Sequence, residues 1–268
     1  TLATVEQMMS ETAVLAAERV EQELIAYRNV AMDTGCIPQL SDGMASVEVK
    51  RAIIDERVSM HGFQRGNIVG LNGKSIFDGN DYSDREYVQQ AMGGAVYVSE
   101  PLVSKVTGEL SIIVAAPIYA GGSRGGSIVG VVYFVPPETF LNDIVSSIKV
   151  SENSRAYMIN KSDTIADNTL DTITTQNIER EAQSDASLKE LAAIHGEMRQ
   201  GKNGFGGFKS SSGPYYAAYA PVSGTDGWSI AVTAMQQDYL KDTYVGMLIN
   251  VLVVVVSALA SIVVALKL

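Results

Sequence analysis

The residues best suited to chemistry lie in one short segment of the first half of the chain. Ser83 and Glu86 have the Ser-x-x-Glu spacing of a capping box, which predicts Ser83 at a helix N-cap and Arg85 in the first turn. A cation there opposes the helix dipole, so we expect a compensating anion. A bound carboxylate, held by backbone N–H groups and the guanidinium, could supply it. Asp84 and Glu86 could also neutralise Arg85 locally, which would leave it an ordinary solvent-facing arginine.

Other side chains could complete an anion site around Arg85. Aromatic walls and hydroxyl groups are common in small-molecule sites, and two tyrosines flank this arginine. Strand alternation with Leu102 and Val135 is expected to turn Ser104 and Tyr133 toward the same cavity. A lysine next to Ser104 could reach in or could be a surface lysine. The predicted ligand-binding residues are Arg85, Tyr87, Tyr82, Leu102, Ser104, Lys105, Tyr133 and Val135.

Several other classes of site lack the residues they need. Cys36 is the only cysteine, which excludes an internal disulfide and a cysteine metal cluster. The two histidines, His61 and His195, are far apart in sequence, and we interpret both as incidental. No nucleophile, base and acid occur in a recognisable spacing. The sequence therefore predicts a protein that is not an enzyme and has no catalytic residues, metal site or cofactor.

Composition indicates a globular protein with one strongly apolar segment. The chain has 268 residues, enough for two ordinary domains, with 46% hydrophobic and 19% charged residues. Its net charge of −10 argues against a nucleic-acid partner. The segment from Gly246 to Leu266 has 21 residues without a charge, and at about 1.5 Å per residue it would span a bilayer. We therefore predict a transmembrane helix there.

The elements that must position the site begin with a long helix. Apolar residues at spacings of three and four predict it over residues 1–34, ended by Gly35 and Pro38. A second helix is expected over residues 47–61, with Gly62 as its stop. The apolar stripe of the first helix consists of Leu2, Val5, Met9, Ala13, Ala16, Val20, Leu24, Tyr27 and Ala31.

Short apolar runs broken by Gly, Asn, Asp and Ser follow, as in antiparallel strands and hairpins. Predicted strands in the first half are residues 68–71, 75–78, 96–99, 111–119 and 127–135, with helices at 84–92 and 138–148. In the second half, strands are predicted at 156–159, 164–167, 204–209, 215–222 and 228–235, with a helical stretch at 178–200.

The two halves also share short sequences, which predicts an internal repeat. Ala-Pro-Ile at 116–118 is echoed by Ala-Pro-Val at 220–222, and Ser-Ile at 127–128 by Ser-Ile at 229–230. We therefore expect two stacked units of antiparallel sheet beside the long helix, with the last helix continuing from Gln236 toward the membrane.

A series of short motifs carries a resemblance to a known family. They are Asp-Tyr-Ser-Asp-Arg-Glu-Tyr at 81–87, Val-Ser-Glu-Pro at 98–101, Ser-Lys-Val-Thr-Gly-Glu at 104–109, Ala-Ala-Pro-Ile-Tyr at 115–119, Val-Gly-Val-Val at 129–132, Tyr-Ala-Pro-Val at 219–222 and Thr-Asp-Gly-Trp at 225–228. In this order and spacing they resemble the double Cache (dCache) sensor module of bacterial chemoreceptors, sensor kinases and diguanylate cyclases.

The resemblance implies an α+β fold in which a long N-terminal helix packs along two PAS-like antiparallel-sheet subdomains and a transmembrane helix follows. Residues 1–62 would form the long helix and a connecting helix, and residues 63–149 a membrane-distal subdomain that binds ligand. Residues 150–240 would form a membrane-proximal subdomain, which in this family usually binds nothing, and residues 241–268 the transmembrane helix. The resemblance also implies a homodimer whose helices pass the signal inward.

Two branches of the family bear on the ligand. The amino-acid-sensing branch marks its pocket with an Arg-x-Trp-Tyr run and a strand aspartate. Tyr87 matches the tyrosine, but Asp84 replaces the arginine, Glu86 the tryptophan and Val135 the aspartate. A branch that senses small carboxylates carries Arg-x-Tyr-Phe, which residues 85–88 resemble except at the last position.

We therefore expect the ligand-sensing domain of a methyl-accepting chemotaxis receptor in the cell membrane, with residues 1–240 extracytoplasmic. It would bind a small polar or carboxylate metabolite in the distal subdomain, and its cytoplasmic output domain would lie outside this chain. The same module could instead serve a histidine kinase or diguanylate cyclase. It could also be a membrane-anchored interaction protein without a small-molecule ligand.

Overall fold

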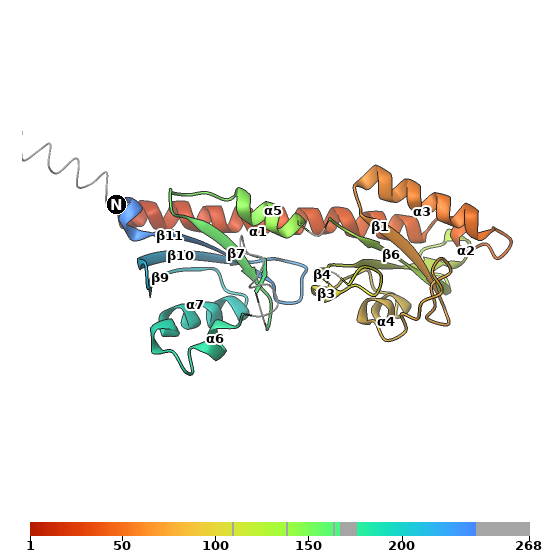
Figure 1. Ribbon diagram of the computed structural model, residues 1–268. Coiled ribbons are helices and arrows are strands. Elements are labelled where there is room, and N and C mark those ends of the chain that lie inside the picture. The colour runs from red at the N-terminus through yellow and green to blue at the C-terminus, as the bar shows by residue number, and fades with distance from the viewer. Residues whose placement is uncertain (109, 138, 163, 167–175, 240–268) are drawn as a thin grey trace, which may run out of the picture.

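The computed structural model describes residues 1–108, 110–137, 139–162, 164–166 and 176–239. The predicted α+β architecture is confirmed: α1 (Leu2–Gly35) runs beside two antiparallel sheets in an elongated molecule (Figure 1). We call the sheet beside the C-terminal part of α1, with the elements around it, the first unit. The sheet beside the N-terminal part of α1 belongs to the second unit.

The first unit has the strand order β1-β6-β5-β2. One face carries a core shared by α1 and α3, to which Ile54 and Ile68 belong, and the opposite face packs against α4. A two-stranded ribbon, β3 with β4, lies on the α4 side. The elements are α2 (Pro38–Ser41), α3 (Val47–His61), β1 (Arg65–Gly70), α4 (Glu86–Met92), β2 (Tyr97–Val98), β3 (Leu102–Val103), β4 (Leu110–Ser111), β5 (Val114–Tyr119), η1 (Ala120–Gly122) and β6 (Ile128–Val135).

The second unit has the strand order β8-β7-β11-β10-β9. Its sheet packs against α1 and α5 on one face and against α7 on the other. The elements are α5 (Phe140–Ser147), β7 (Arg155–Ile159), β8 (Thr164–Ala166), α6 (Ile178–Glu181), η3 (Ala186–Leu188), α7 (Lys189–Arg199), β9 (Gly204–Ser210), β10 (Gly213–Pro221) and β11 (Ser229–Met235).

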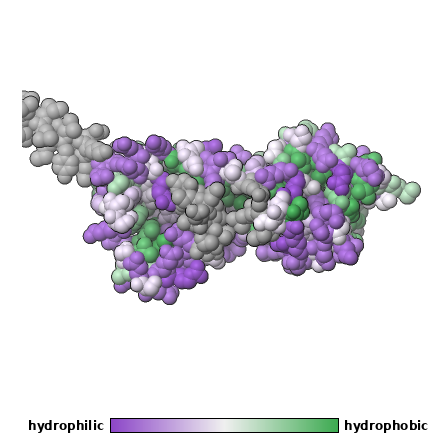
Figure 2. Space-filling model, viewed as in Figure 1, coloured by the Kyte–Doolittle hydropathy of each residue, from purple (hydrophilic) through white to green (hydrophobic). Residues whose placement is uncertain are grey.

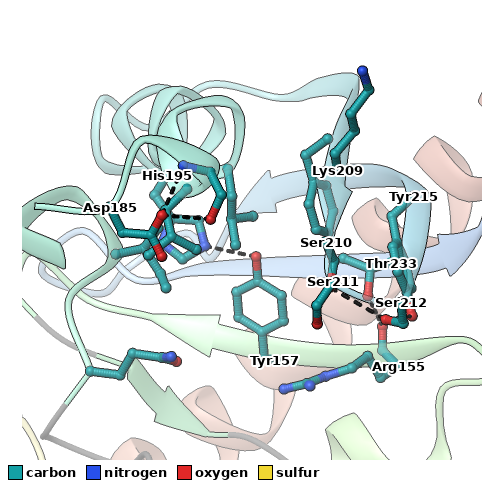
Figure 3. A pocket seen from close by; sticks show the side chains of 16 residues that line it. Arg155, Tyr157, Asp185, His195, Lys209, Ser210, Ser211, Ser212, Tyr215 and Thr233 are labelled. Atoms are coloured by element: carbon teal, nitrogen blue, oxygen red, sulfur yellow. Dashed lines mark hydrogen bonds between the residues drawn. The ribbon is translucent and has the colours of Figure 1, made fainter. Parts of the chain in front are cut away.

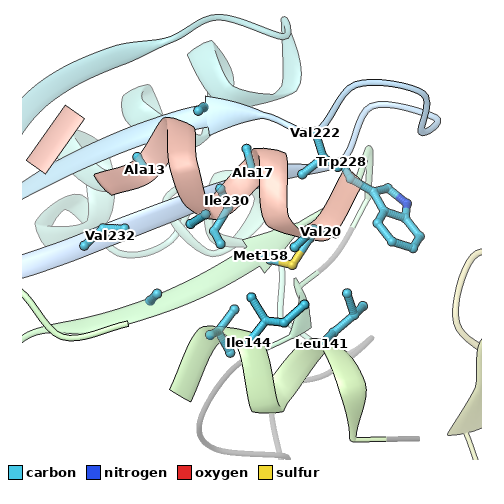
Figure 4. Close-up of a cluster of buried hydrophobic side chains, with 14 of the residues drawn as sticks. Ala13, Ala17, Val20, Leu141, Ile144, Met158, Val222, Trp228, Ile230 and Val232 are labelled. Carbon is cyan, nitrogen blue, oxygen red and sulfur yellow. The ribbon is translucent and has the colours of Figure 1, made fainter. Parts of the chain in front are cut away.

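The apolar stripe of α1 contributes to the cores of both units. Met9, Val20 and Leu24 are almost fully buried against α5 and the second-unit sheet, where Figure 4 shows Val20 close to Met158. Farther along the helix, Ala31 belongs to the first-unit core. The predicted stripe is thus confirmed except at the exposed N-terminal end of the helix. The face of α1 that carries the stripe packs against the two sheets of the same chain.

The two units share one strand pattern, because equivalent residues pair in the two sheets. In the first unit Pro117 pairs with Val131 and Val131 with Val69; in the second, Pro221 pairs with Ser229 and Ser229 with Ile159. Aligning the two prolines makes positions 131 and 229 equivalent, so the echo between 127–128 and 229–230 was not a match of equivalent positions. The echo at 116–118 and 220–222 is preserved.

The same register equates the first residues of β1 and β7. Arg65 pairs with Val135, and Arg155 pairs with Thr233. Both arginines lie on the sheet face opposite α1, because they alternate with residues that face the α1 side. Each unit therefore begins its sheet with an arginine on the equivalent face.

Local side-chain chemistry explains where the predicted elements were right or wrong. α3 begins after Ser46, whose side chain accepts from the Val49 N–H, and ends at Gly62 in the left-handed conformation, as predicted. The predicted strand at 75–78 is a turn. The predicted helical stretch at 178–200 is interrupted, because the Asp185 carboxylate accepts from the Ser187 N–H and starts a new turn.

Within the described residues, no helix combines the length and apolarity required to cross a bilayer. The predicted span from Gly246 to Leu266 lies outside those residues. On the face shown in Figure 2 the surface is mostly hydrophilic, and hydrophobic residues gather mainly on the half formed by the first unit. Exposed apolar side chains on or beside α3 include Met44, Val49 and Met60.

Gly35 is where α1 comes closest to the first-unit sheet, and a substitution there tests this packing. A Cβ atom at this position would lie 2.0 Å from the carbonyl oxygen of Pro117, so helix and strand would have to separate. We expect Gly35→Ala to lower the free energy of unfolding by about 2 kcal/mol or more. Gly43→Ala is the matched control, because nothing lies within 4 Å of its added Cβ. Equal denaturation midpoints for the two variants would contradict the packing.

Candidate functional site

A polar network lies on the sheet face that α4 covers in the first unit. The buried amide of Asn67 donates to the Tyr133 hydroxyl at 3.1 Å and to Asp78 Oδ2 at 3.0 Å. Its Oδ1 accepts from the Ser75 hydroxyl at 2.7 Å. The Tyr82 hydroxyl also donates to Asp78 Oδ2, at 2.9 Å. These bonds hold the turn at 75–78 against the sheet and explain why this segment does not form a strand.

Three tyrosines form the apolar wall beside this network. The Tyr133 ring lies 5.3 Å from the Tyr87 ring and 5.8 Å from the Tyr82 ring, between ring centroids. All three side chains are almost completely buried. Burial raises the pKa of Tyr87 and of Tyr133 well above the usual tyrosine range, so both hydroxyls stay protonated and can donate.

Arg85 is the N-cap of α4, and the capping-box prediction is wrong. The Asp81 carboxylate accepts from the Ser83 N–H at 2.9 Å, and the Arg85 N–H donates to the Tyr82 carbonyl oxygen at 2.9 Å. The chain therefore turns once more before the helix begins at Glu86. Arg85 itself has an extended backbone, so it precedes the first helical turn.

The two acidic neighbours of Arg85 are engaged elsewhere. Asp84 accepts from Lys105 Nζ at 2.5 Å, and this bond holds the pKa of Asp84 below its usual value. Burial, and after it the negative charge of the nearby Glu86 carboxylate, raise the pKa of Tyr97 to about 12. Within the described residues neither carboxylate forms a hydrogen bond with Arg85, although Asp84 interacts with it electrostatically.

Two arginines on this side of the sheet have an unused donor. The Nε atoms of Arg85 and Arg65 are both shielded from solvent, and neither has a hydrogen-bond partner among the residues that the structure describes. A buried donor without a partner costs about 1–3 kcal/mol. Both groups could recover that free energy by donating to an anion.

The segment after β2 carries Ser104 and Lys105, which form hydrogen bonds with residues on this side of the sheet. Arg65 Nη2 donates to Ser104 Oγ at 2.8 Å, and this oxygen also accepts from the backbone N–H groups of Val106 and Thr107. Lys105 neither enters the network nor lies free at the surface. Its ammonium donates to the Asp81 carbonyl oxygen at 2.8 Å and lies 5.7 Å from the centroid of the Tyr82 ring.

The structure thus gathers the predicted residues on one face. Tyr82, Tyr87, Tyr133 and Val135 share one buried cluster, against which Leu102 packs. Arg85 lies at the N-terminus of α4, Lys105 contacts its neighbour Asp84, and Ser104 contacts Arg65. Among the described residues, no group of three His, Cys, Asp or Glu side chains could hold a metal ion.

Sequence reasoning missed Arg65 and Asn67. Both precede the predicted strand at 68–71, because β1 begins three residues earlier than expected. The available signal was strand alternation: residues 65, 67 and 69 face the same side, and Val69 belongs to the cluster of tyrosines.

Comparisons with known proteins identify a family and a shared fold. The sequence profile dCache_1, described as Cache domain, matches residues 2–243. No curated protein matches the sequence significantly. Many solved structures match this chain, and the three described next share the fold at 13–18% sequence identity.

Three of these structures show which kinds of protein share the fold. The extracellular domain of mmHK1S-Z2, assigned as a histidine kinase, has a TM-score of 0.66 at 18% identity, over 90% of this chain and 100% of that chain. The ligand-binding domain of the Pseudomonas fluorescens chemoreceptor CtaA, in complex with L-serine, has a TM-score of 0.67 at 13% identity, over 88% and 100%. That of the Pseudomonas aeruginosa PAO1 amino acid chemoreceptor PctB, in complex with L-Arg, has a TM-score of 0.66 at 16% identity, over 88% and 97%.

Asn67 is the centre of the polar network, and its removal tests the network's contribution to folding. Asn67→Ala leaves the Tyr133 hydroxyl and the Ser75 hydroxyl without their partner, so we expect a loss of about 2–3 kcal/mol in the free energy of unfolding. Asn29→Ala, on the exposed face of α1, should change it by no more than about 0.5 kcal/mol. Urea denaturation of both variants measures the difference, and similar effects would rule out a structural role for the network.

Proposed function

Because the chain belongs to the Cache-domain family, we propose that it is the extracytoplasmic ligand-sensing part of a transmembrane receptor and that its first unit binds a small carboxylate. Domains of this family are sensory ligand-binding modules rather than catalytic ones. The first unit, residues 63–149, would be membrane-distal, and residues 150–240 membrane-proximal.

The observation that carries the proposal is that two buried guanidinium Nε atoms, in Arg65 and Arg85, have no hydrogen-bond partner within the described part of the chain. Guanidinium groups bind carboxylates through parallel N–H donors, and such charge-assisted bonds are stronger than neutral ones. The protonated hydroxyls of Tyr87 and Tyr133 can add further donors. An anion would therefore find several donors near Arg85, whose neighbour Asp84 accepts a hydrogen bond from Lys105 instead.

The residues also support a choice among ligand classes. CtaA and PctB are crystallised with amino acids, whose ammonium group requires an acceptor such as a carboxylate. Val135 stands where the amino-acid-sensing branch has its strand aspartate, and it pairs with Arg65 across the sheet. A cation beside that position disfavours an ammonium group. We therefore propose an organic acid without an amino group as the ligand.

We further propose that the signal leaves the first unit through Glu100. This carboxylate accepts from Trp228 Nε1 at 2.7 Å and from Asn160 Nδ2 at 2.5 Å, both in the second unit. Burial raises its pKa, against the effect of these two bonds. Glu100 directly precedes the segment that carries Ser104 and Lys105, so a ligand that moves this segment would also move the residue that contacts the start of β11.

The span from Gly246 to Leu266 would carry this motion across the membrane from the helix that follows β11. A homodimer is part of the proposal. Because the α1 stripe is buried within the chain, the dimer would use apolar residues that stay exposed, such as Leu15 on α1 and Met60 on α3. The output could be chemotactic signalling, as for CtaA, or a histidine kinase, as assigned for mmHK1S-Z2.

Substitution of Arg85 tests the ligand site. A panel of organic acids and amino acids is first screened by thermal shift, because a ligand that binds only the folded state raises the melting temperature. For the best organic acid, Arg85→Ala and Arg65→Ala should each weaken binding about tenfold or more by calorimetry, since a hydrogen bond to a charged group contributes about 1.5–3 kcal/mol. Arg124→Ala, on an exposed hairpin turn, should leave the affinity unchanged.

Two results would count against the ligand site. Unchanged affinity in Arg85→Ala removes this arginine from it. If no compound in the panel shifts the melting temperature, the interaction-protein alternative, without a small-molecule ligand, is favoured instead.

Substitution of Glu100 tests the proposed signal route. We expect the ligand to slow amide hydrogen exchange over residues 228–235 in the wild type. In Glu100→Ala this protection should disappear, while the affinity in the first unit stays within about threefold. Glu56→Ala, on the exposed side of α3, is the control and should behave like the wild type. Protection that persists in Glu100→Ala would exclude this route.

A further inference from the structure

The second unit has a cavity of its own, of about 430 Å³. It lies between the sheet and the α6–α7 segment, and its volume is within the range of small-molecule sites (Figure 3). Its lining includes Arg155 and Tyr157 from β7, His195 from α7, Phe208 from β9, Tyr215 from β10 and Thr233 from β11. The cavity therefore draws residues from four adjoining elements of the sheet and from the helix that covers it.

This cavity corresponds in the fold to the ligand side of the first unit. Arg155 pairs with Thr233 just as Arg65 pairs with Val135, and both arginines begin the first strand of their sheet. Tyr157 takes the position of Asn67, two residues farther along the strand and on the same face. The second unit thus repeats the placement of an arginine next to a hydrogen-bonding side chain.

His195 is part of the cavity wall, which corrects its interpretation as an incidental histidine. Its Nε2 lies 2.7 Å from the Tyr157 hydroxyl, and its ring is almost fully buried. Burial lowers the pKa of His195 to about 4, so the ring is neutral at physiological pH. The nearest carboxylate, Glu179, lies 3.9 Å from its Nδ1 and is already paired with Arg199. The histidine therefore fixes the Tyr157 hydroxyl without adding charge.

Charge around the cavity favours an anion at one end. Arg155 is exposed at the rim, 5.9 Å from the centroid of the Tyr157 ring. Asp185, the only acidic residue among the described part of the lining, accepts hydrogen bonds from both the backbone N–H and the hydroxyl of Ser187. Lys209 also contributes to the lining, but its side chain points away from the other labelled residues in Figure 3.

One side of the cavity is aromatic and apolar, whereas polar residues also contribute to its lining: Gln176, Ser210, Ser211, Ser212 and Thr233. Phe208 and Tyr215 stack with ring centroids 5.4 Å apart, and Ile178, Leu188 and Leu191 complete this side. These surfaces differ from the equivalent face of the first unit, where Asn67 forms hydrogen bonds with the Tyr133 and Ser75 hydroxyls. A ligand for the second unit would need one anionic end and an apolar or aromatic body.

We propose that the second unit holds a separate binding site for a small monocarboxylate with an apolar or aromatic body. Its carboxylate is held at Arg155, and its body packs against Phe208, Tyr215 and Leu188. The site is independent of the proposed carboxylate site in the first unit, so a dimeric receptor of this kind would read two compounds in one subunit.

Benzoate is a suitable probe, because it has one carboxylate and a flat aromatic body. Binding to the purified chain is followed by calorimetry and by ligand-observed NMR, up to roughly 10 mM benzoate, so that even a dissociation constant of roughly 1 mM is detected. We expect saturable binding that Arg155→Ala weakens about tenfold or more. Leu188→Trp, which fills the cavity without removing a charge, should weaken it similarly, and Arg124→Ala should have no effect.

Further variants distinguish benzoate binding at this site from benzoate binding in the first unit. Circular dichroism confirms that each variant is folded, and Arg85→Ala reports any benzoate bound in the first unit. Binding that Arg85→Ala abolishes and that both Arg155→Ala and Leu188→Trp retain would overturn the proposal, as would the absence of binding to the wild type. Failure of the organic-acid screen in the first unit would leave this result unaffected.

Discussion

One helix contributes to a hydrophobic core in each unit, and the rest of the molecule depends on that constraint. Met9, Val20 and Leu24 bury against the second unit, whereas Ala31 and Gly35 lie against the first. One face of each sheet therefore packs against α1. The opposite face is left to short helices and loops, and both candidate sites lie there. The two units are connected by a continuous helix and by the hydrogen bonds that Glu100 accepts from Trp228 and Asn160.

The sheet faces opposite α1 carry different side chains in the two units, although the strand pattern is the same. Both begin with an arginine at the first position of the first strand, next to a hydrogen-bonding residue two positions on. In the first unit the next layer is polar: Asn67, Asp78 and Tyr133 form a connected network, with Arg85 at the edge of α4. In the second unit the corresponding layer is aromatic, and a neutral His195 fixes Tyr157. Shared topology and divergent side chains are compatible with two ligands in one sensor.

The parts that could be predicted from the sequence are those whose signals are local. The period of α1 and the Ser46 and Gly62 caps of α3 determine those helices almost to the residue. Arg85 was misplaced because Asp81 competes for the Ser83 N–H and delays the helix, although the pattern fits a capping box. Arg65 and His195 depend on contacts between distant strands and helices, such as the bond between Arg65 and Ser104, and no local pattern reveals these. The span from Gly246 to Leu266 lies outside the described residues.

The account is tested most directly by the Nε–H resonances of Arg65 and Arg85, observed by ¹H–¹⁵N NMR and assigned with Arg→Lys variants. The organic acid that most raises the melting temperature is titrated into the protein. If the buried donors receive the ligand, both resonances should shift downfield and become protected from solvent exchange as the site fills. Resonances that stay unchanged at saturating ligand would contradict the central claim, because the anion would then be held elsewhere.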